Sequence, residues 1–416
     1  MVRDASPWNL TAVGKLGRIV TGKTPPTKRT EYFGDNYPFI TPTDIDQYSR
    51  TVETQRSLSE EGRQYLRNYL LPPRAICFVC IGATIGKICM TKTPSFSNQQ
   101  INTVIADEAN HDPRFVYYLL RHNADYIKAI AGGAATPIIN KSAFSRVELT
   151  VPPFPTQRKI AAILSAYDDL IENNLRRIKI LEEMAQLIYQ EWFVNFRFPG
   201  HENVEMADSE LGMIPGNWRL RRLGDMAHFV RGIEPGSKNY LNEPHEGTVP
   251  FIRVGDLGSR QSGLFIPQEL ARGRLLNRHD IAITLDGTVG IVQMGLTGAY
   301  STGIRKVVAQ DSGQLSWAYV YFLLKSEHIQ GIIRAHARGT TIQHASSAID
   351  HMTFVCPPRD LMQAFDSCAS PLLTGVLNIM QRNVILRCTR DLLLPKLISG
   401  ELDVSELDID MEGAPQ

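Results

Sequence analysis

Polar and basic side chains gather in short segments between apolar runs, in the first half of the chain and again in the second. In the first half they are Lys23, Thr24, Lys28, Arg29, Thr41, Thr43, Lys87, Ser97, Asn98, Gln99, Gln100, Asn140 and Lys141. In the second half they are Arg231, Lys238, Asn239, Arg253, Arg260, Ser301, Thr302, Arg305, Lys306, Arg338, Thr340, Thr341, Gln343 and His344. Arg and Lys can bind phosphates or the acceptor edge of guanine, and Asn and Gln can pair with adenine. Any one of these side chains could be an ordinary solvated surface residue, so their recurrence at matching places is what favours a nucleic-acid contact.

One segment, Gly17 to Thr24, matches the G-x-x-x-x-G-K-[ST] pattern of phosphate-binding loops. Such a loop needs a helix that begins at the lysine, so that the amides of the helix N-terminus face the phosphates. Here Pro25 and Pro26 follow at once, and the matching segment 227–234 lacks the first glycine, the lysine and the threonine. We therefore do not expect a nucleotide site.

The chain carries no recognisable catalytic motif. Val151-Pro-Pro-Phe resembles the [ND]-P-P-[YF] motif of amino-group DNA methyltransferases, but a valine cannot accept a hydrogen bond from the target amine. No Gly-rich turn suited to S-adenosylmethionine and no G-x-S-x-G elbow is present, and the ten histidines have no metal-binding spacing. We predict no catalytic residues, and we expect Pro152 and Pro153 to end a strand and start a helix.

Cys77 and Cys80 form a C-x-x-C pair among six cysteines. A structural zinc site needs four ligands, and no second pair exists. The surrounding segment AICFVCIG predicts a buried strand, and the repeat puts Ile281 and Thr284 at the matching places. We therefore expect core cysteines and no metal.

An internal repeat organises these segments. Trp8-Asn-Leu recurs as Trp218-Arg-Leu, YPFITPTDID (37–46) as VPFIRVGDLG (249–258), and ATIGKICM (83–90) as GTVGIVQM (287–294). Apolar runs such as AICFVCIG and DIAITL predict short strands, and segments 115–131 and 318–334 predict one amphipathic helix late in each body. Each copy is an α+β body followed by a long helix.

The two long helices have a coiled-coil pattern. Leu164, Ile171, Ile178, Ala185 and Trp192 recur every seven residues, with Tyr167, Asn174, Leu181 and Ile188 between them. About 205 residues later the pattern returns, with Leu372, Ile379, Leu386 and Leu393 in one row and Val376, Asn383, Arg390 and Leu397 in the other. Either helix alone could instead be an amphipathic helix on an ordinary core. Polar seam residues such as Asn383 and Arg390 would weaken the pairing but fix its register.

These patterns predict two tandem, pseudo-two-fold-related α+β domains separated by two long antiparallel coiled-coil helices. The predicted boundaries are 1–155 for the first body, 156–205 for the central helix, 206–358 for the second body, 359–402 for the distal helix and 403–416 for an acidic C-terminal tail. A rod of about 45 Å would place the bodies roughly one DNA turn apart, so that inserting a helical turn near Ala185 should lengthen the tolerated gap between half-sites.

Charge alternates along the chain although the net charge is only +1. The bodies are basic, with 18 Lys and Arg against 13 Asp and Glu in residues 1–155 and 15 against 11 in 215–358. The helical segments are acidic, with 6 against 10 in 156–214 and 5 against 9 in 359–416. A polyanion would therefore bind the bodies. With no membrane-span or signal-peptide pattern, we expect a cytoplasmic protein without membrane contact.

The chain resembles the DNA-specificity subunits of type I restriction-modification enzymes over essentially its whole length. The likeness rests on the repeated W-x-L openings, on PFITPTDI, ATIGK and FSNQQIN, and most specifically on LEEMAQLIYQEWFVNF (181–196) and RDLLLPKLISGELDV (390–404). The second copy departs from the family pattern, with Gly303-Ile-Arg305 where the first has Gln99-Gln-Ile101 and with Ile291 in place of Lys87.

This resemblance implies that each body is a target-recognition domain, similar to the DNA-reading domain of adenine-N6 methyltransferases, and that the helices dock two modification subunits. The complex would methylate adenine in a bipartite double-stranded DNA site and, with restriction subunits, cleave DNA. S-adenosylmethionine, ATP and Mg would then belong to the partner subunits. Two alternatives stay open from the residues, a stand-alone adenine DNA methyltransferase and a coiled-coil scaffold without DNA function.

Overall fold

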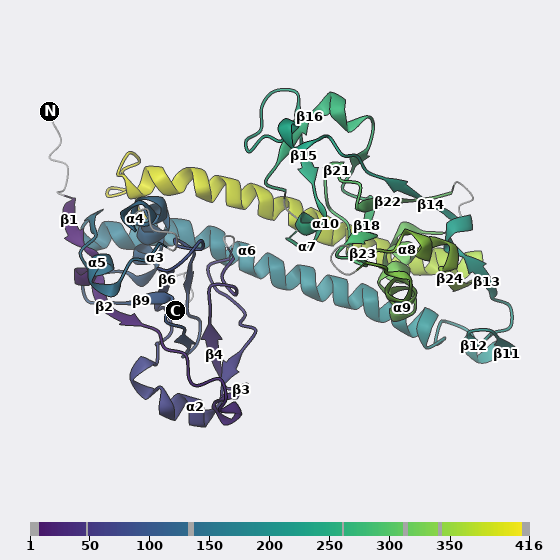
Figure 1. The fold of residues 1–416 in the computed structure, drawn as a ribbon, viewed down its shortest axis with the longest axis horizontal. Helices are drawn as coiled ribbons and strands as arrows, with labels where there is room; N and C mark the ends of the chain where they lie inside the picture. Colours follow the sequence, from purple (N-terminus) through teal and green to yellow (C-terminus); the bar gives the residue numbers. More distant parts are fainter. Residues whose placement is uncertain are drawn as a thin grey trace. The chain divides into compact units, whose positions relative to one another are not determined.

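The computed structural model describes residues 8–46, 49–131, 137–259, 262–310, 315–339 and 343–409. The chain forms two compact units. Unit 1 comprises residues 1–173 and 383–416, and unit 2 comprises residues 174–382. Each unit contains one α+β body and a part of both long helices, α6 (Phe154–Tyr189) and α10 (Arg359–Ile398), which Figure 1 shows as continuous ribbons.

Helix α6 begins directly after the Pro152-Pro153 pair that follows strand β10 (Glu148–Val151), as the sequence predicts. A π-helical turn at Gln190–Val194 ends it, and α10 ends at Ile398 before Gly400, whose φ of +77° suits a glycine. Within each unit the two helices run antiparallel. In unit 1 Lys159 donates to the Ser405 carbonyl while Asp168, farther along α6, pairs with Arg390. In unit 2 Tyr189 packs against Phe365, whereas the earlier Leu181 lies beside Gly375.

The heptad pattern is confirmed by burial. Leu164, Ile171, Ile178 and Ala185 are buried on α6, and Val376, Ile379 and Leu397 are buried on α10. The predicted seam residues Leu181, Ile188, Leu386 and Leu393 are half-buried. Asn383 and Arg390 are buried polar residues, so the polar interruption expected in the seam is also present.

The body of unit 1 is built from two four-stranded sheets, ordered β2-β9-β6-β7 and β3-β5-β4-β8, and from the β1-β10 pair. The first sheet is antiparallel, whereas β4 and β8 run parallel. Its described strands are β1 (Asn9–Ala12), β2 (Gly17–Thr21), β3 (Phe33–Gly34), β4 (Tyr37–Ile40), β5 (Ser57–Leu58), β6 (Ile76–Val79), β7 (Ile88–Met90), β8 (Phe96–Ser97), β9 (Ile101–Ala106) and β10. Its shorter helices are α1 (Val13–Leu16), α2 (Glu60–Tyr65), α3 (Pro113–His122), α4 (Ala124–Ile130) and α5 (Lys141–Ser145).

The body of unit 2 repeats this plan with the sheets β14-β22-β18-β20 and β16-β15-β21-β17 and the pair β13-β24. Hairpin β11-β12 and the pair β19-β23 are additional. The described strands are β11 (Met206–Ser209), β12 (Gly212–Pro215), β13 (Arg219–Arg222), β14 (Ala227–Arg231), β15 (Thr248–Ile252), β16 (Phe265–Pro267), β17 (Leu275–Leu276), β18 (Ile281–Thr284), β19 (Asp286–Gly287), β20 (Val292–Gln293), β21 (Gly298–Tyr300), β22 (Ile304–Ala309), β23 (Gln343–His344) and β24 (Thr353–Cys356). The shorter helices are α7 (Val254–Ser259), α8 (Trp317–Lys325) and α9 (Glu327–His336).

The prediction of one amphipathic helix late in each body is wrong in two respects. Each segment contains two helices, because Asn123 separates α3 from α4 and Ser326 separates α8 from α9. The Ser326 hydroxyl accepts from the Ile329 amide, which caps α9 and favours a new helix start. Residues 318–324 of α8 are buried on every side, so α8 is not amphipathic, whereas α3 is amphipathic, with Arg114, Arg121 and His122 as its less buried residues.

Each unit has its own apolar core. In unit 1, strand β6 is wholly buried and packs with α3 and with Leu394 and Leu397 of α10. In unit 2, an aromatic cluster joins Tyr189 and Phe193 of the α6 end to Tyr319 and Phe365. No helix in the described part of the chain combines the length and apolar character that crossing a membrane requires.

Candidate nucleic-acid interface

In unit 1, three segments far apart in sequence meet where strands β2, β4 and β8 end. The Gly22 amide donates to the Ile101 carbonyl at 3.0 Å, and the Lys23 amide donates to the Ser97 carbonyl at 2.9 Å. The Asn98 amide donates to the Ile40 carbonyl at 3.1 Å. A Cβ atom on Gly22 would lie only 2.2 Å from the Asn98 carbonyl oxygen, so this close approach requires a glycine. We call these meeting loops the first loop cluster, residues 21–24, 41–44 and 97–102.

Several predicted side chains come together in the first loop cluster. Thr24 Oγ1 donates to Gln99 Oε1 at 2.7 Å, and Asn98 Nδ2 donates to Gln100 Oε1 at 3.0 Å. The exposed Lys23 has its Nζ 5.5 Å from the centre of the Tyr69 ring, within cation–π range. Asn98 is itself buried, so the exposed groups of this pattern are the Lys23 ammonium and the Gln99 amide.

Other predicted contacts serve the fold of the first loop cluster. Thr41 is buried, and its hydroxyl and amide both donate to Asp44 Oδ2, at 2.6 and 2.7 Å. Lys87 Nζ donates to the Pro42 carbonyl at 3.1 Å, which ties the loop after β6 to the same turn. These two residues therefore position the loop, whereas Thr43 and Lys28 are exposed.

The remaining predicted residues of unit 1 have local partners or lie on a neighbouring helix. Arg29 is exposed and pairs with Glu31 at 3.1 Å. Asn140 is the N-cap of α5, because its side chain accepts from the Ala143 amide. Lys141 is the first residue of that helix and is exposed.

Unit 2 builds a second loop cluster, residues 231–234, 253–256 and 300–305, with the same backbone bonds. The Gly232 amide donates to the Ile304 carbonyl at 3.3 Å, the Ile233 amide to the Tyr300 carbonyl at 2.9 Å and the Ser301 amide to the Ile252 carbonyl at 2.9 Å. Gly232 also requires its glycine, since a Cβ atom would lie 2.2 Å from the Tyr300 oxygen. The repeat therefore extends from sequence to hydrogen-bonding register.

This register corrects the sequence alignment by one residue in two places. Gly303-Ile304-Arg305 matches Gln100-Ile101-Asn102, and not Gln99-Gln-Ile101, because β22 pairs with β14 as β9 pairs with β2. Ala282 and Leu285, and not Ile281 and Thr284, stand at the places of Cys77 and Cys80. The replacement of Lys87 by Ile291 is confirmed. The Lys87 carbonyl accepts from the Val79 amide of β6, and the Ile291 carbonyl accepts from the matching Thr284 amide of β18.

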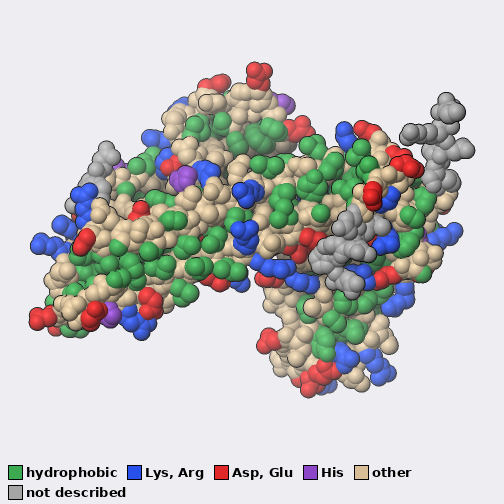
Figure 2. Space-filling model, turned by 180° about the vertical axis from the view of Figure 1, so that it is seen from behind, with side chains coloured by type: hydrophobic (Ala, Val, Ile, Leu, Met, Phe, Trp, Pro, Cys, Tyr) green, Lys and Arg blue, Asp and Glu red, His purple; other side chains and the backbone are tan. Residues whose placement is uncertain are grey.

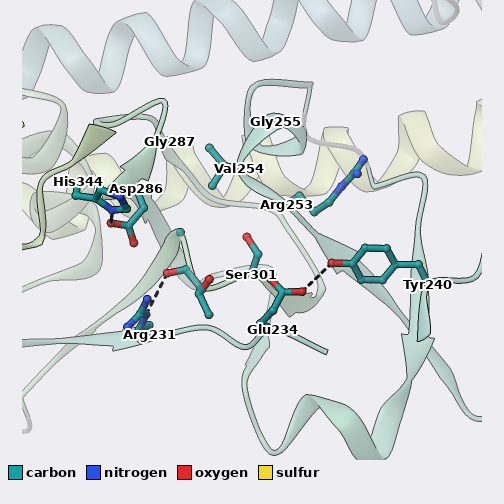
Figure 3. Close-up of a pocket in the computed structure, with 12 residues that line it drawn as sticks. Arg231, Glu234, Tyr240, Arg253, Val254, Gly255, Asp286, Gly287, Ser301 and His344 are labelled. Atoms are coloured by element: carbon teal, nitrogen blue, oxygen red, sulfur yellow. Dashed lines mark hydrogen bonds and ion pairs between the residues drawn. The ribbon is translucent and has the colours of Figure 1, made fainter. Parts of the chain in front are cut away.

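An open cavity of about 620 Å³ lies at the second loop cluster. Figure 3 shows Arg231, Arg253, Glu234, Tyr240, Asp286 and His344 around it. Arg231 Nε donates to the Thr302 carbonyl at 3.4 Å, and Tyr240 donates to Glu234 Oε1 at 3.0 Å. Ser301 and Thr302 also line the cavity, and the exposed Arg253 pairs with Asp256 at 3.4 Å.

Two residues of unit 2 that were predicted to contact DNA, Arg305 and Lys306, have charges that are already paired inside the protein. Arg305 is only 6% exposed, and it donates to the Thr302 carbonyl, to Ser346 Oγ at 2.8 Å and to Asp286 Oδ2 at 3.3 Å. Burial lowers the pKa of Arg305, and the neighbouring Asp286 opposes this shift. Lys306 Nζ pairs with Asp280 at 2.6 Å. Neither cation faces the cavity as a free group.

The other predicted residues of unit 2 are exposed or outside the described part. Lys238, Arg338 and Gln343 are exposed, and Asn239 donates to the Pro235 carbonyl at 2.5 Å. Arg260, Thr340 and Thr341 lie outside the described residues. Sequence reasoning missed Asp286, Glu234 and Tyr240 because single acidic or aromatic residues carry no motif. The position of Asp286 two residues after the end of the buried strand β18 was the available signal.

The rejected motifs are explained by the fold. Gly17–Thr21 is strand β2, and residues 22–29 form a loop with no helix at Lys23, so the phosphate-loop pattern is accidental. Cys77 and Cys80 are buried in β6 and in the turn that follows it, which confirms them as core residues. Among the described residues no group of three or more His, Cys, Asp or Glu side chains could hold a metal ion.

The fold and the two clusters define a class of protein, a duplicated recognition protein in which one loop scaffold carries two sets of polar side chains. Residues 5–183 and 215–360 match a family described as the type I restriction modification DNA specificity domain. The chain belongs to this family, and it is a specificity subunit of a type I restriction-modification system.

Individual relatives agree with this assignment. The type I restriction enzyme MjaIX specificity subunit of Methanocaldococcus jannaschii is 29% identical over 413 residues, covering 96% of this chain and 94% of the relative. The type I restriction enzyme HindI specificity subunit of Haemophilus influenzae is 34% identical over 182 residues, 42% of this chain and 39% of the relative. The crystal structure of a type I restriction-modification system S subunit from M. genitalium shares the fold, with a TM-score of 0.58 at 15% identity over 95% of this chain and 97% of that chain.

Proposed function

We propose that this chain reads a bipartite double-stranded DNA target, one half-site per loop cluster, and that it has no catalytic residues of its own. The observation that carries the proposal is that both bodies hold the same three loops by the same backbone bonds but present different side chains. A shared scaffold with variable polar groups suits recognition of two different base sequences. The basic charge of both bodies supports binding of a polyanion.

The decisive experiment maps methylated adenines in DNA from cells that carry this chain with its modification partner. We expect a bipartite motif with two unlike halves separated by unspecified bases. The purified chain alone should neither bind S-adenosylmethionine in calorimetry nor methylate DNA. Donor binding by the isolated chain would favour a stand-alone methyltransferase, and absence of DNA binding by the complex would favour a scaffold.

The proposed partners are two modification subunits, docked at two equivalent helix faces. Ile180, Met184 and Leu187 lie on one face of α6 in unit 2, since they are four and three residues apart, and Leu187 is 60% exposed. Ile385 and Leu392 on α10 in unit 1 occupy the matching places of the helical repeat, and Leu392 is 70% exposed. Figure 2 shows hydrophobic side chains gathered along the helical surface. Exposed apolar side chains at this spacing are typical of helix-in-groove contacts.

Charge substitutions at these two faces test the docking. Leu187→Glu should remove one modification subunit and Leu392→Glu the other, and the double variant should remove both, as measured by the mass of the assembled complex. Gln186→Glu is the matched control, because it adds the same charge on a neighbouring exposed position of α6. A double variant that still binds two modification subunits would contradict the assignment.

The remaining parts of the proposal concern cofactors and further partners. S-adenosylmethionine would be bound by the modification subunits, and ATP and Mg by restriction subunits that join the complex. Reading of cellular DNA would place the assembly in the cytoplasm.

A further inference from the structure

One backbone bridge at the edge of each loop cluster carries a different side-chain pair in the two bodies. In unit 1 the bridge joins Ile81 to Ile138, and the Ile139 amide donates to the Cys80 carbonyl at 2.9 Å. In unit 2 it joins Asp286 to His344, and the Ala345 amide donates to the Leu285 carbonyl at 2.8 Å. Ile138 and His344 therefore occupy equivalent positions on the same scaffold.

Both side chains face outward from this bridge. Ile138 is 52% exposed, and the His344 side chain is 65% exposed. His344 lines the cavity of the second loop cluster. Burial in the core therefore does not account for the residue type at either position.

The histidine is oriented by a fixed chain of polar contacts. His344 Nδ1 lies 2.8 Å from Asp286 Oδ1, and the other oxygen of Asp286 accepts from the buried Arg305 at 3.3 Å. An ionised carboxylate only accepts hydrogen bonds, so Nδ1 carries the proton and Nε2 is the ring nitrogen left for a ligand. Figure 3 shows this pair beside the cavity, on the same side as Arg231. The ion pair with Arg305 therefore holds in place the Asp286 carboxylate that orients His344.

We propose that Ile138 and His344 are specificity-determining residues, each contacting one base of the half-site that its own body reads. Ile138 offers an apolar contact of the kind that thymine methyl groups accept, and His344 offers Nε2 for a hydrogen bond to a base edge. Asp286 and Arg305 are positioning residues for His344. This inference rests on the proposed reading of one half-site by each body.

The test uses the full chain in complex with its modification partner and maps the methylated motif of each variant. His344→Ala should lower discrimination at one base position of one half-site by roughly 5- to 150-fold, and Ile138→Ala should relax one position of the other half-site. His344→Ile, which gives the second body the residue type of the first, should shift the preferred base at its position towards thymine. His228→Ala is the matched control, because this exposed histidine of β14 lies at the opposite end of the strand from the cluster.

The outcomes separate this inference from the function on which it rests. Both residues are exposed, so the variants should unfold at the wild-type temperature. Motifs unchanged in all three variants would overturn the inference while leaving the bipartite reading intact. Uniformly weaker DNA binding with a smaller salt dependence would also overturn it, because that result identifies a phosphate contact. A wild-type complex without any bipartite motif would instead overturn the proposed function itself.

Discussion

Single residues decide how tightly the loops of each cluster can approach one another. Gly22 and Gly232 carry no positive φ, so their role is steric and lies in the missing Cβ atom. In both bodies that atom would collide with carbonyl oxygens of the facing loop, which are backbone atoms and cannot rotate away. The recurrence of the glycines in the sequence therefore has a packing cause.

We expect Gly22→Ala and Gly232→Ala each to lower the free energy of unfolding by about 1–3 kcal/mol, since overpacking forces backbone shifts. Each should also disturb the half-site read by its own body. Thermal unfolding and motif mapping measure the two effects. The control is Gly258→Ala in α7, where no atom lies within 4 Å of the added Cβ atom and the change should be close to neutral. Equal stabilities of all three variants would contradict the steric role.

At the scale of elements, a buried polar network joins α3 to the two long helices within unit 1. Arg390 of α10 is only 1% exposed and pairs with Asp168 of α6, whose other oxygen accepts from the Tyr118 hydroxyl at 2.5 Å. Burial, and then the charge of Asp168, raise the pKa of Tyr118 well above its ordinary value, so the hydroxyl keeps its proton and remains a donor. Arg390 was predicted as a polar interruption of the helix seam. The network shows that Asp168 and Tyr118 are the partners through which Arg390 fixes the register of α10 against α6.

We expect Arg390→Ala to lower the free energy of unfolding by about 3–5 kcal/mol, because it leaves a buried carboxylate without its cation. The combined variant Asp168→Leu, Arg390→Met and Tyr118→Phe removes the three buried polar groups and leaves only the half-exposed Asp391 without Arg390, so it should be destabilised less than the single variant. Chemical denaturation of the three proteins measures this order. A single variant as stable as the wild type would show that the pair is not needed.

For the whole molecule, the proposed function implies that each unit would contribute its own phosphate contacts to one DNA complex. Each apolar cluster formed by the described residues lies within a single unit, which favours independent folding of the two bodies. The expectation that the long helices set the distance between half-sites stays a prediction, which an insertion near Ala185 tests.

Independent contacts should give additive salt effects. We expect Lys28→Ala and Lys238→Ala each to reduce the slope of log affinity against log salt by about 0.9, and the double variant to reduce it by about 1.8. Equilibrium binding at several salt concentrations provides the slopes. Lys92→Ala is the control. Lys92 follows Thr91, whose amide donates to the Ala75 carbonyl just before β6. The first loop cluster lies at the other end of β6, so we expect Lys92 to make no phosphate contact. A double variant with the wild-type slope would exclude both lysines from the phosphate contacts.

Repetition and local periodicity were sufficient to predict the duplicated bodies, the heptad helices and the core cysteines, because each depends on spacing that is read directly from the sequence. The family was indicated by the resemblance of the quoted motifs. Only the tertiary structure decided that Arg305 matches Asn102 and that Arg305 forms an ion pair with Asp286. The same is true of the equivalence of Ile138 and His344 in the two bodies. Strand register and charge pairing depend on partners far away in the chain. A one-residue error in aligning the two copies cannot be detected from sequence when the strands are short and the alignment contains gaps.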